Sequence, residues 1–102
     1  MPYTLVIKEE ARLDMLEAYQ YYEQQQTGLG EQFLSEVEKR LDDITSHPEY
    51  YSFIDNRKIL RDIVLDKFPY VVIYDVIGFE ITVFAVHFTK RNPAKTNIPR
   101  IE

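Results

Sequence analysis

Residues 68–88 read FPYVVIYDVIGFEITVFAVHF, and this stretch decides the fold. Tyr70–Val76 and Phe79–Phe88 are runs of β-branched and aromatic residues, which favour strands. The Ile77-Gly78 pair between them is short enough for a hairpin turn. Because Tyr70–Val76 is apolar on both faces, we expect it to be a central strand. These residues therefore predict an antiparallel pair at the centre of a sheet.

Two further strands are predicted outside this pair. Lys58–Leu65 has the period-two pattern of a strand, and the four residues Asp66-Lys67-Phe68-Pro69 supply a turn into the next one. Near the N-terminus, Tyr3–Ile7 is a short β-branched run that leads directly into a helical pattern. The sheet should therefore have four strands.

Two amphipathic helices are predicted between the first strand and the other three. Apolar residues recur at helical spacing in two stripes, first Ala11, Met15, Ala18, Tyr19 and Tyr22, then Phe33, Val37, Leu41 and Ile44. Gly28 lies between the stripes and can adopt the left-handed conformation that ends a helix, and Pro48 follows the second stripe. The predicted fold class is α+β with the order β-α-α-β-β-β, a helical hairpin packed on one face of a small, mainly antiparallel sheet.

Length and composition predict a single domain spanning residues 1–102. The chain has no cysteine, so disulfides and thiolate metal sites are excluded, as is usual in a reducing cytoplasm. No apolar run approaches the roughly 18 residues of a membrane helix, and the N-terminus has no secretory signal pattern. We therefore expect a cytoplasmic protein without a membrane partner.

Charge is distributed unevenly along the chain. Residues 9–46 hold ten acidic residues and three basic ones, whereas residues 47–102 hold seven and eight, within a net charge of -5. A basic tail begins at about residue 89, and it is expected to become ordered only when something binds it. A negative net charge does not fit a strongly cationic nucleic-acid binder.

The signatures of cofactor and metal enzymes are missing. Three glycines are too few and too scattered for a phosphate-cradling loop or a dinucleotide fingerprint. The two histidines are not spaced as a helical metal-ligand pair. Neighbouring acids such as Glu9-Glu10 and Asp42-Asp43 are typical of solvated helix surface. The sequence therefore predicts no cofactor and no metal.

His87 and Arg91 form the candidate catalytic corner. His87 lies near the end of the last predicted strand, and Arg91 follows four residues later. Imidazole exchanges protons near neutral pH and guanidinium holds phosphate, so the pair supplies groups that RNA cleavage through the 2′-hydroxyl requires. The alternative is that His87 fills the strand end and hydrogen-bonds to backbone.

Three further cations are assigned to nucleic-acid or target binding: Arg61, Lys90 and Lys95. For Arg61 the alternative is a salt bridge with a surface acid. Arg57 is left out, because an antiparallel meander places it about 25 Å from His87 at about 3.3 Å per residue.

The order of these motifs resembles the RelE/ParE superfamily of bacterial toxins and is nearest to its plasmid-stabilisation, ParE-like branch. The resemblance covers residues 3–93 and rests on Tyr21-Tyr22, Gly28–Phe33 (GLGEQF), the Phe68-Pro69-Tyr70 step, and His87 with Arg91. It implies the toxin of a type II toxin-antitoxin module. Such a toxin is held inactive in an oligomeric complex by a cognate antitoxin, whose extended C-terminal segment wraps it.

The superfamily contains two activities, and the resemblance bears on them differently. In its ribosome-dependent messenger ribonucleases, cations and a tyrosine occupy positions that here read Asp62, Val64, Val71, Arg91 and Asn97. Only the arginine is retained. The other branch poisons DNA gyrase by binding it, without chemistry of its own.

Three hypotheses for function follow. The leading one is a toxin that inhibits growth by binding DNA gyrase. The second is a ribosome-associated mRNA endonuclease that needs no metal, with His87 as proton-transfer group, Arg91 as phosphate anchor, and Lys90 and Arg61 as secondary cations. The third is an inactive family member that acts as an interaction module.

Overall fold

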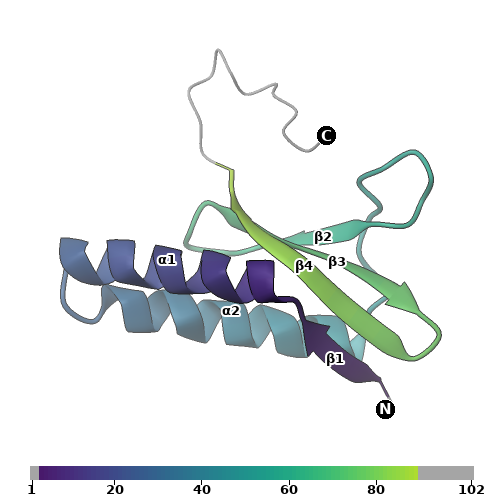
Figure 1. The fold of residues 1–102 in the computed structure, drawn as a ribbon, viewed down its shortest axis with the longest axis horizontal. Coiled ribbons are helices and arrows are strands. Elements are labelled where there is room, and N and C mark those ends of the chain that lie inside the picture. The colour runs from purple at the N-terminus through teal and green to yellow at the C-terminus, as the bar shows by residue number, and fades with distance from the viewer. Residues whose placement is uncertain (1–2, 90–102) are drawn as a thin grey trace.

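The computed structural model describes residues 3–89, and it has the predicted order of elements (Figure 1). The elements are β1 (Thr4–Ile7), α1 (Glu9–Gln25), α2 (Leu29–Ser46), β2 (Arg61–Val64), β3 (Tyr70–Ile77) and β4 (Glu80–Phe88). The sheet order is β1-β4-β3-β2, with both hairpin pairings antiparallel and β1 parallel to β4. The prediction of an α+β fold with a mainly antiparallel sheet is confirmed.

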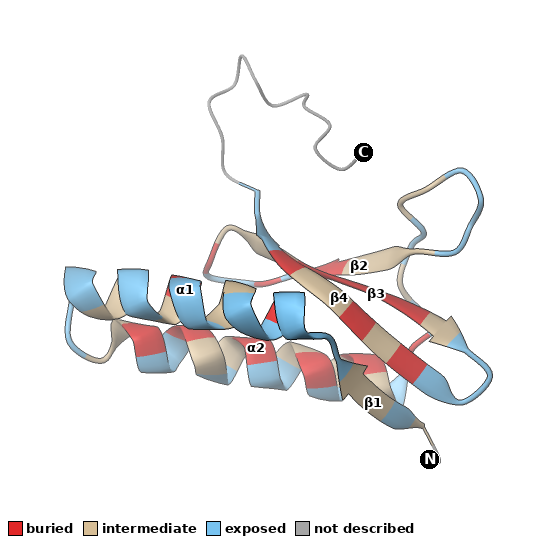
Figure 2. Ribbon diagram, in the orientation of Figure 1, coloured by how far each residue is buried: buried red, intermediate tan, exposed pale blue. Residues whose placement is uncertain are grey.

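The helical hairpin covers one face of the sheet, and the core lies between the two layers (Figure 2). On α2 the predicted stripe of Phe33, Val37, Leu41 and Ile44 is buried. Opposite it, the sheet contributes side chains from β2, β3 and β4: Ile63, Val72, Tyr74, Ile81, Val83 and Val86. None of the described helices combines the length and apolarity needed to cross a membrane.

The turn between α1 and α2 is closed by one carboxylate. The two Glu23 oxygens accept the backbone N–H groups of Gly28 and Gly30, each at 2.9 Å. Gly28 has the predicted left-handed conformation, with φ of 91°. At Gly30 an added Cβ would lie 2.7 Å from the carbonyl oxygen of Tyr19. The two helices are therefore so close at this point that only glycine fits. The GLGEQF motif is therefore a packing motif of the hairpin.

The first hairpin strand is shorter than predicted. It spans Arg61–Val64, whereas the period-two pattern indicated Lys58–Leu65. The Asp55 carboxylate accepts the N–H groups of Ile59 and Leu60 at 2.9 and 3.1 Å, and Lys58 has a positive φ of 58°. Asp55 thus holds these residues in a turn, which the alternation of side chains does not reveal.

Candidate functional site

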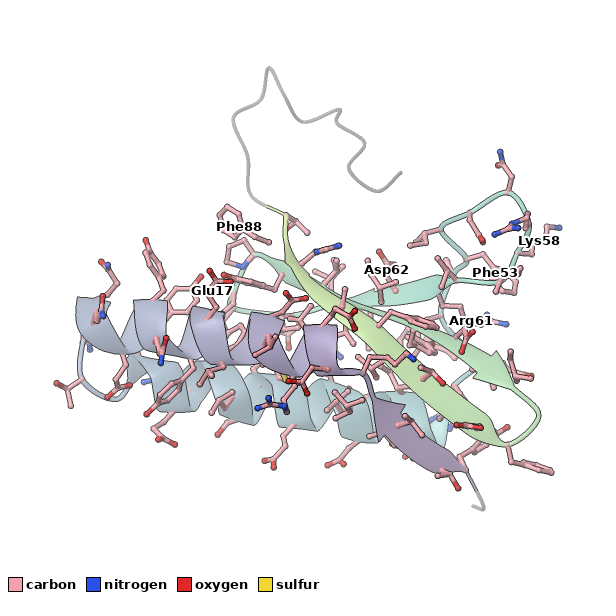
Figure 3. All side chains as sticks on the ribbon, in the orientation of Figure 1. Glu17, Phe53, Lys58, Arg61, Asp62 and Phe88 are labelled. Atoms are coloured by element: carbon pink, nitrogen blue, oxygen red, sulfur yellow. The ribbon has the colours of Figure 1, made fainter. Side chains whose placement is uncertain are left out.

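A groove of about 590 Å³ lies between α1 and the ends of β3 and β4. Figure 3 shows Glu17 on α1 and Phe88 at the end of β4 on the same side of the molecule. We call it the α1 groove, and its lining residues are Asp14, Glu17, Ala18, Tyr21, Tyr22, Tyr70, Val86, His87 and Phe88. It includes the predicted catalytic residue His87.

An aromatic cluster forms one wall of the α1 groove and connects it to the core. The ring of Tyr22 lies 4.9 Å from that of Phe68 and 5.6 Å from that of Phe33, measured between centroids. Tyr70 packs edge-on against Phe88 at 5.4 Å. Such edge-to-face pairs add specific geometry to apolar burial. Two of the sequence motifs, Tyr21-Tyr22 and Phe68-Pro69-Tyr70, thus meet in space at this groove.

Asp14 fastens α1 to the edge of β4. One of its carboxylate oxygens accepts the backbone N–H of Val86 at 3.0 Å. β1 pairs with β4 only as far as Val83, so this N–H lies beyond the last strand partner. An edge N–H without a partner costs free energy, and Asp14 satisfies it. Asp14 was not identified from the sequence, because its partner lies 72 residues away and no local pattern links the two.

The α1 groove has a negative electrostatic character. Burial raises the pKa of Tyr70 to about 12, and the nearby Glu17 and Asp14 carboxylates push it in the same direction. Burial also raises the pKa of Tyr22. Both phenols are therefore neutral at physiological pH. Among the residues described, Asp14 and Glu17 are the acids that line the groove, and no lysine or arginine lines it.

His87 lies at the predicted place near the strand end, and it is exposed. Its cross-strand partner on β3 is Val71, which in turn pairs with Val64 on β2. Within residues 3–89, no lysine or arginine lines the groove beside the imidazole. His87 therefore has access to solvent and to the groove, but its described neighbours on the sheet are apolar.

The guanidinium group of Arg61 binds to the loop before β2. Its guanidinium donates to the carbonyl oxygens of Tyr51 at 2.6 Å and Glu49 at 3.2 Å, and it lies 3.9 Å from the centroid of the Phe53 ring (Figure 3). The salt bridge with a surface acid that the sequence suggested is not among the ion pairs of the described chain. Its assignment to target binding stays a prediction.

Register also separates Arg61 from His87. Arg61 pairs with Tyr74 and His87 pairs with Val71, so the two lie three residues apart along β3, about 10 Å at 3.3 Å per residue. The remaining predicted site residues, Lys90, Arg91 and Lys95, lie outside the described residues. The proposed pairing of His87 with Arg91 therefore stays a prediction.

Asp62 occupies the sheet face opposite the helices (Figure 3). It alternates with Ile63, which is buried against the helical layer, and pairs with Ile73 on β3. Burial raises the pKa of Asp62. Within residues 3–89, no group of three His, Asp or Glu side chains is arranged to hold a metal ion.

Comparisons with known proteins agree on one fold. The family model described as the ParE toxin of the type II toxin-antitoxin system parDE matches residues 5–93 of this chain. A search of curated proteins finds no match.

Solved structures of toxin-antitoxin systems share the fold. A toxin-antitoxin structure of the chromosomal ParDE system from P. aeruginosa has 16% identity and a TM-score of 0.66, covering 87% of this chain and 98% of that chain. A mutant E. coli toxin RelE bound to an antitoxin RelB peptide has 19% identity, a TM-score of 0.71 and complete coverage of both chains. Isolated E. coli RelE has 20% identity and a TM-score of 0.61, over 92% of each chain.

Proposed function

The chain belongs to the ParE toxin family of type II toxin-antitoxin systems, and on this premise we propose that it arrests growth by binding DNA gyrase in the cytoplasm. A cognate antitoxin holds it inactive in an oligomeric complex. The family description names the parDE system, and structural neighbours of this chain include toxins solved together with antitoxin segments. Both proposed partners, gyrase and the antitoxin, are proteins.

The residues around His87 favour a binding function over catalysis. A scissile phosphate needs cations to hold it and to balance the charge of the transition state. In the described chain, the sheet face beside His87 presents Val71 and Val64, and the next pair along it is Asp62 with Ile73. The two valines offer no hydrogen-bond donor or positive charge to a phosphate, and the carboxylate repels it. This surface suits a protein partner better than RNA.

The second candidate is a ribosome-associated mRNA endonuclease that needs no metal. It is favoured by the exposure of His87, which leaves the imidazole able to exchange a proton with a bound substrate. In this hypothesis Arg91 anchors the phosphate, while Lys90 and Arg61 contribute more distant positive charge.

The two activities are separated by assaying the purified full chain in two reactions. In the first, gyrase supercoils relaxed plasmid, and in the second, a reconstituted translation system reads an intact message. Gyrase binding predicts that supercoiling stops while the message stays uncut, and that His87→Ala inhibits as strongly as the native chain.

The contrary outcomes are equally defined. Unimpaired supercoiling at saturating protein would eliminate gyrase as the target. Message cleavage that is abolished in both His87→Ala and Arg91→Ala would establish the endonuclease. A chain that affects neither reaction, and whose expression alone leaves growth unchanged, would be the inactive interaction module.

A further inference from the structure

Three apolar side chains are exposed on α1, the helix that forms one side of the α1 groove. Leu13 is 48% exposed, Leu16 44% and Tyr21 56%. Leu13, Glu17 and Tyr21 follow one another at four-residue spacing, so they form a single stripe along the helix, and Leu16 lies next to it. Glu17 and Tyr21 also line the groove, so the groove continues onto the outer surface of α1. Exposed apolar side chains that gather along one helix are typical of interaction sites.

Within the described residues 3–89, the α1 groove is lined by two acidic side chains and by no lysine or arginine. Asp14 and Glu17 come from α1, whereas β3 contributes the neutral Tyr70 and β4 contributes His87. One oxygen of Asp14 is occupied by the N–H of Val86. Glu17 is exposed, and within the described range 3–89 its carboxylate accepts no side-chain or backbone hydrogen bond and forms no ion pair. Its carboxylate is therefore available to a partner.

The aromatic wall favours the same kind of ligand. Tyr21, Tyr70 and Phe88 line the groove next to the two carboxylates. A guanidinium or ammonium group is attracted both to a carboxylate and to the face of an aromatic ring. The volume of about 590 Å³ lies within the range of about 300–1,000 Å³ that is usual for binding pockets. A long cationic side chain satisfies the charge and the shape together.

We propose that the α1 groove receives an arginine or lysine side chain of the antitoxin, and that aliphatic residues flanking this side chain cover Leu13 and Leu16. The inference rests on the proposed function, since it takes the antitoxin as partner, and adds where on the toxin the antitoxin binds and with what chemistry. Charge complementarity selects this occupant, because an acidic segment would be repelled by Asp14 and Glu17.

The test reverses one charge in the groove, makes the same substitution on another surface as a control, and compares the two effects on antitoxin affinity. The probe is the protein encoded by the reading frame adjacent to this one, titrated calorimetrically into the full chain. Glu17→Lys is expected to weaken binding at least thirtyfold. Glu38→Lys, an exposed glutamate on the outer surface of α2, should change it less than twofold. Replacing the responsible basic residue of the antitoxin by glutamate should restore binding to the Glu17→Lys chain.

Other results would overturn the proposal. Unchanged or tighter binding to Glu17→Lys would exclude a basic occupant. If the double variant Lys90→Ser/Arg91→Ser of the full chain binds the antitoxin ten times more tightly, the groove belongs to this chain's own C-terminal residues. If dilution or the Glu17→Lys change dissociates a homodimer of the chain, the occupant is a second copy. Failure of the native chain to bind the antitoxin at all would instead defeat the proposed function.

Discussion

The two helices of the hairpin have nearly the same length but differ in the polarity of their exposed residues. α2 buries Phe33, Val37, Leu41 and Ile44, and every exposed residue along it is polar. α1 buries only Ala11 and Ala18 fully, and it leaves Leu13, Leu16 and Tyr21 exposed. A helix with one apolar face buries that face in the core, whereas exposed apolar residues on a second side of a helix are available to a binding partner. This contrast agrees with a structural role for α2 and with the proposed antitoxin interface on α1.

The scaffold role of α2 predicts a large loss of stability from Phe33→Ala. The ring is fully buried and packs against Tyr22, Phe68 and Tyr70. Truncating a buried phenylalanine typically costs about 3–5 kcal/mol of unfolding free energy. Urea denaturation followed by circular dichroism measures the loss. A cost below about 1 kcal/mol would show that α2 does not organise the core.

The junction of the two helices predicts the next largest effect. In Gly30→Ala the added methyl group meets the Tyr19 carbonyl oxygen and ring at 2.7 Å, and the Glu23 carboxylate at 2.8 Å. Overpacking of this kind costs about 1–3 kcal/mol, which matches or outweighs the roughly 1 kcal/mol that alanine gains in a helix, so we expect a net loss of stability. Thermal unfolding measures the difference. Ser35→Ala, at an exposed position of α2, is the matched control and should leave the midpoint nearly unchanged.

The interface role of α1 predicts that stability and binding respond differently to the same change. Leu13→Ala/Leu16→Ala removes exposed side chains, so each substitution should change the unfolding free energy by less than about 0.5 kcal/mol. The affinity for the antitoxin should fall about tenfold, which corresponds to about 1.4 kcal/mol. Calorimetry and denaturation of the same preparations provide both numbers. A variant that loses stability but binds normally would make α1 a core helix.

The smallest predicted effect concerns the electrostatics of the α1 groove. Tyr70 should ionise near pH 12 in the folded chain, with burial as the main cause and Glu17 as a contributor. Glu17→Gln should therefore lower this pKa, whereas Glu38→Gln on α2 should not. Carbon-13 NMR of the tyrosine ring carbons follows the titration. An unaltered pKa in Glu17→Gln would place the carboxylate too far away to act on the groove.

This titration also has a consequence for stability. The folded pKa of Tyr70 lies above the ordinary value of about 10, so the folded state retains a proton that the unfolded chain releases. The corresponding contribution to stability is complete below about pH 10 and is lost as the pH rises through 12.

Much of the fold follows from local patterns, and the exceptions have physical causes. Alternation and helical spacing identify all four strands and both helices, and Gly28 has the predicted left-handed conformation. The pattern overextended the first hairpin strand, because the Asp55 carboxylate bends the residues before Arg61 into a turn. Strand propensity carries no information about such a side-chain bond.

The candidate site was harder to predict because its contacts are long-range. The strand-end position of His87 follows from counting along the last strand. Asp14 and Val86 are 72 residues apart, and their bond depends on where β1 stops pairing with β4. Arg61 was assigned to target binding, with a salt bridge to a surface acid as the alternative; its carbonyl partners could not be predicted, since they belong to a loop without periodicity. Leu13 and Leu16 lie outside the apolar stripe that was predicted to be buried. Two leucines on the solvent side of an acidic helix are a sequence signal that could have indicated a binding surface.

The division between α1 and α2 is tested most directly by mapping the antitoxin contact on the full chain. In NMR cross-saturation, irradiation of the protonated antitoxin attenuates the amide signals of toxin residues that touch it. We expect attenuation at residues 13–21 and 86–88, with the outer surface of α2 unaffected. Attenuation concentrated on the exposed side of residues 31–42, with the signals of residues 13–21 intact, would contradict the account.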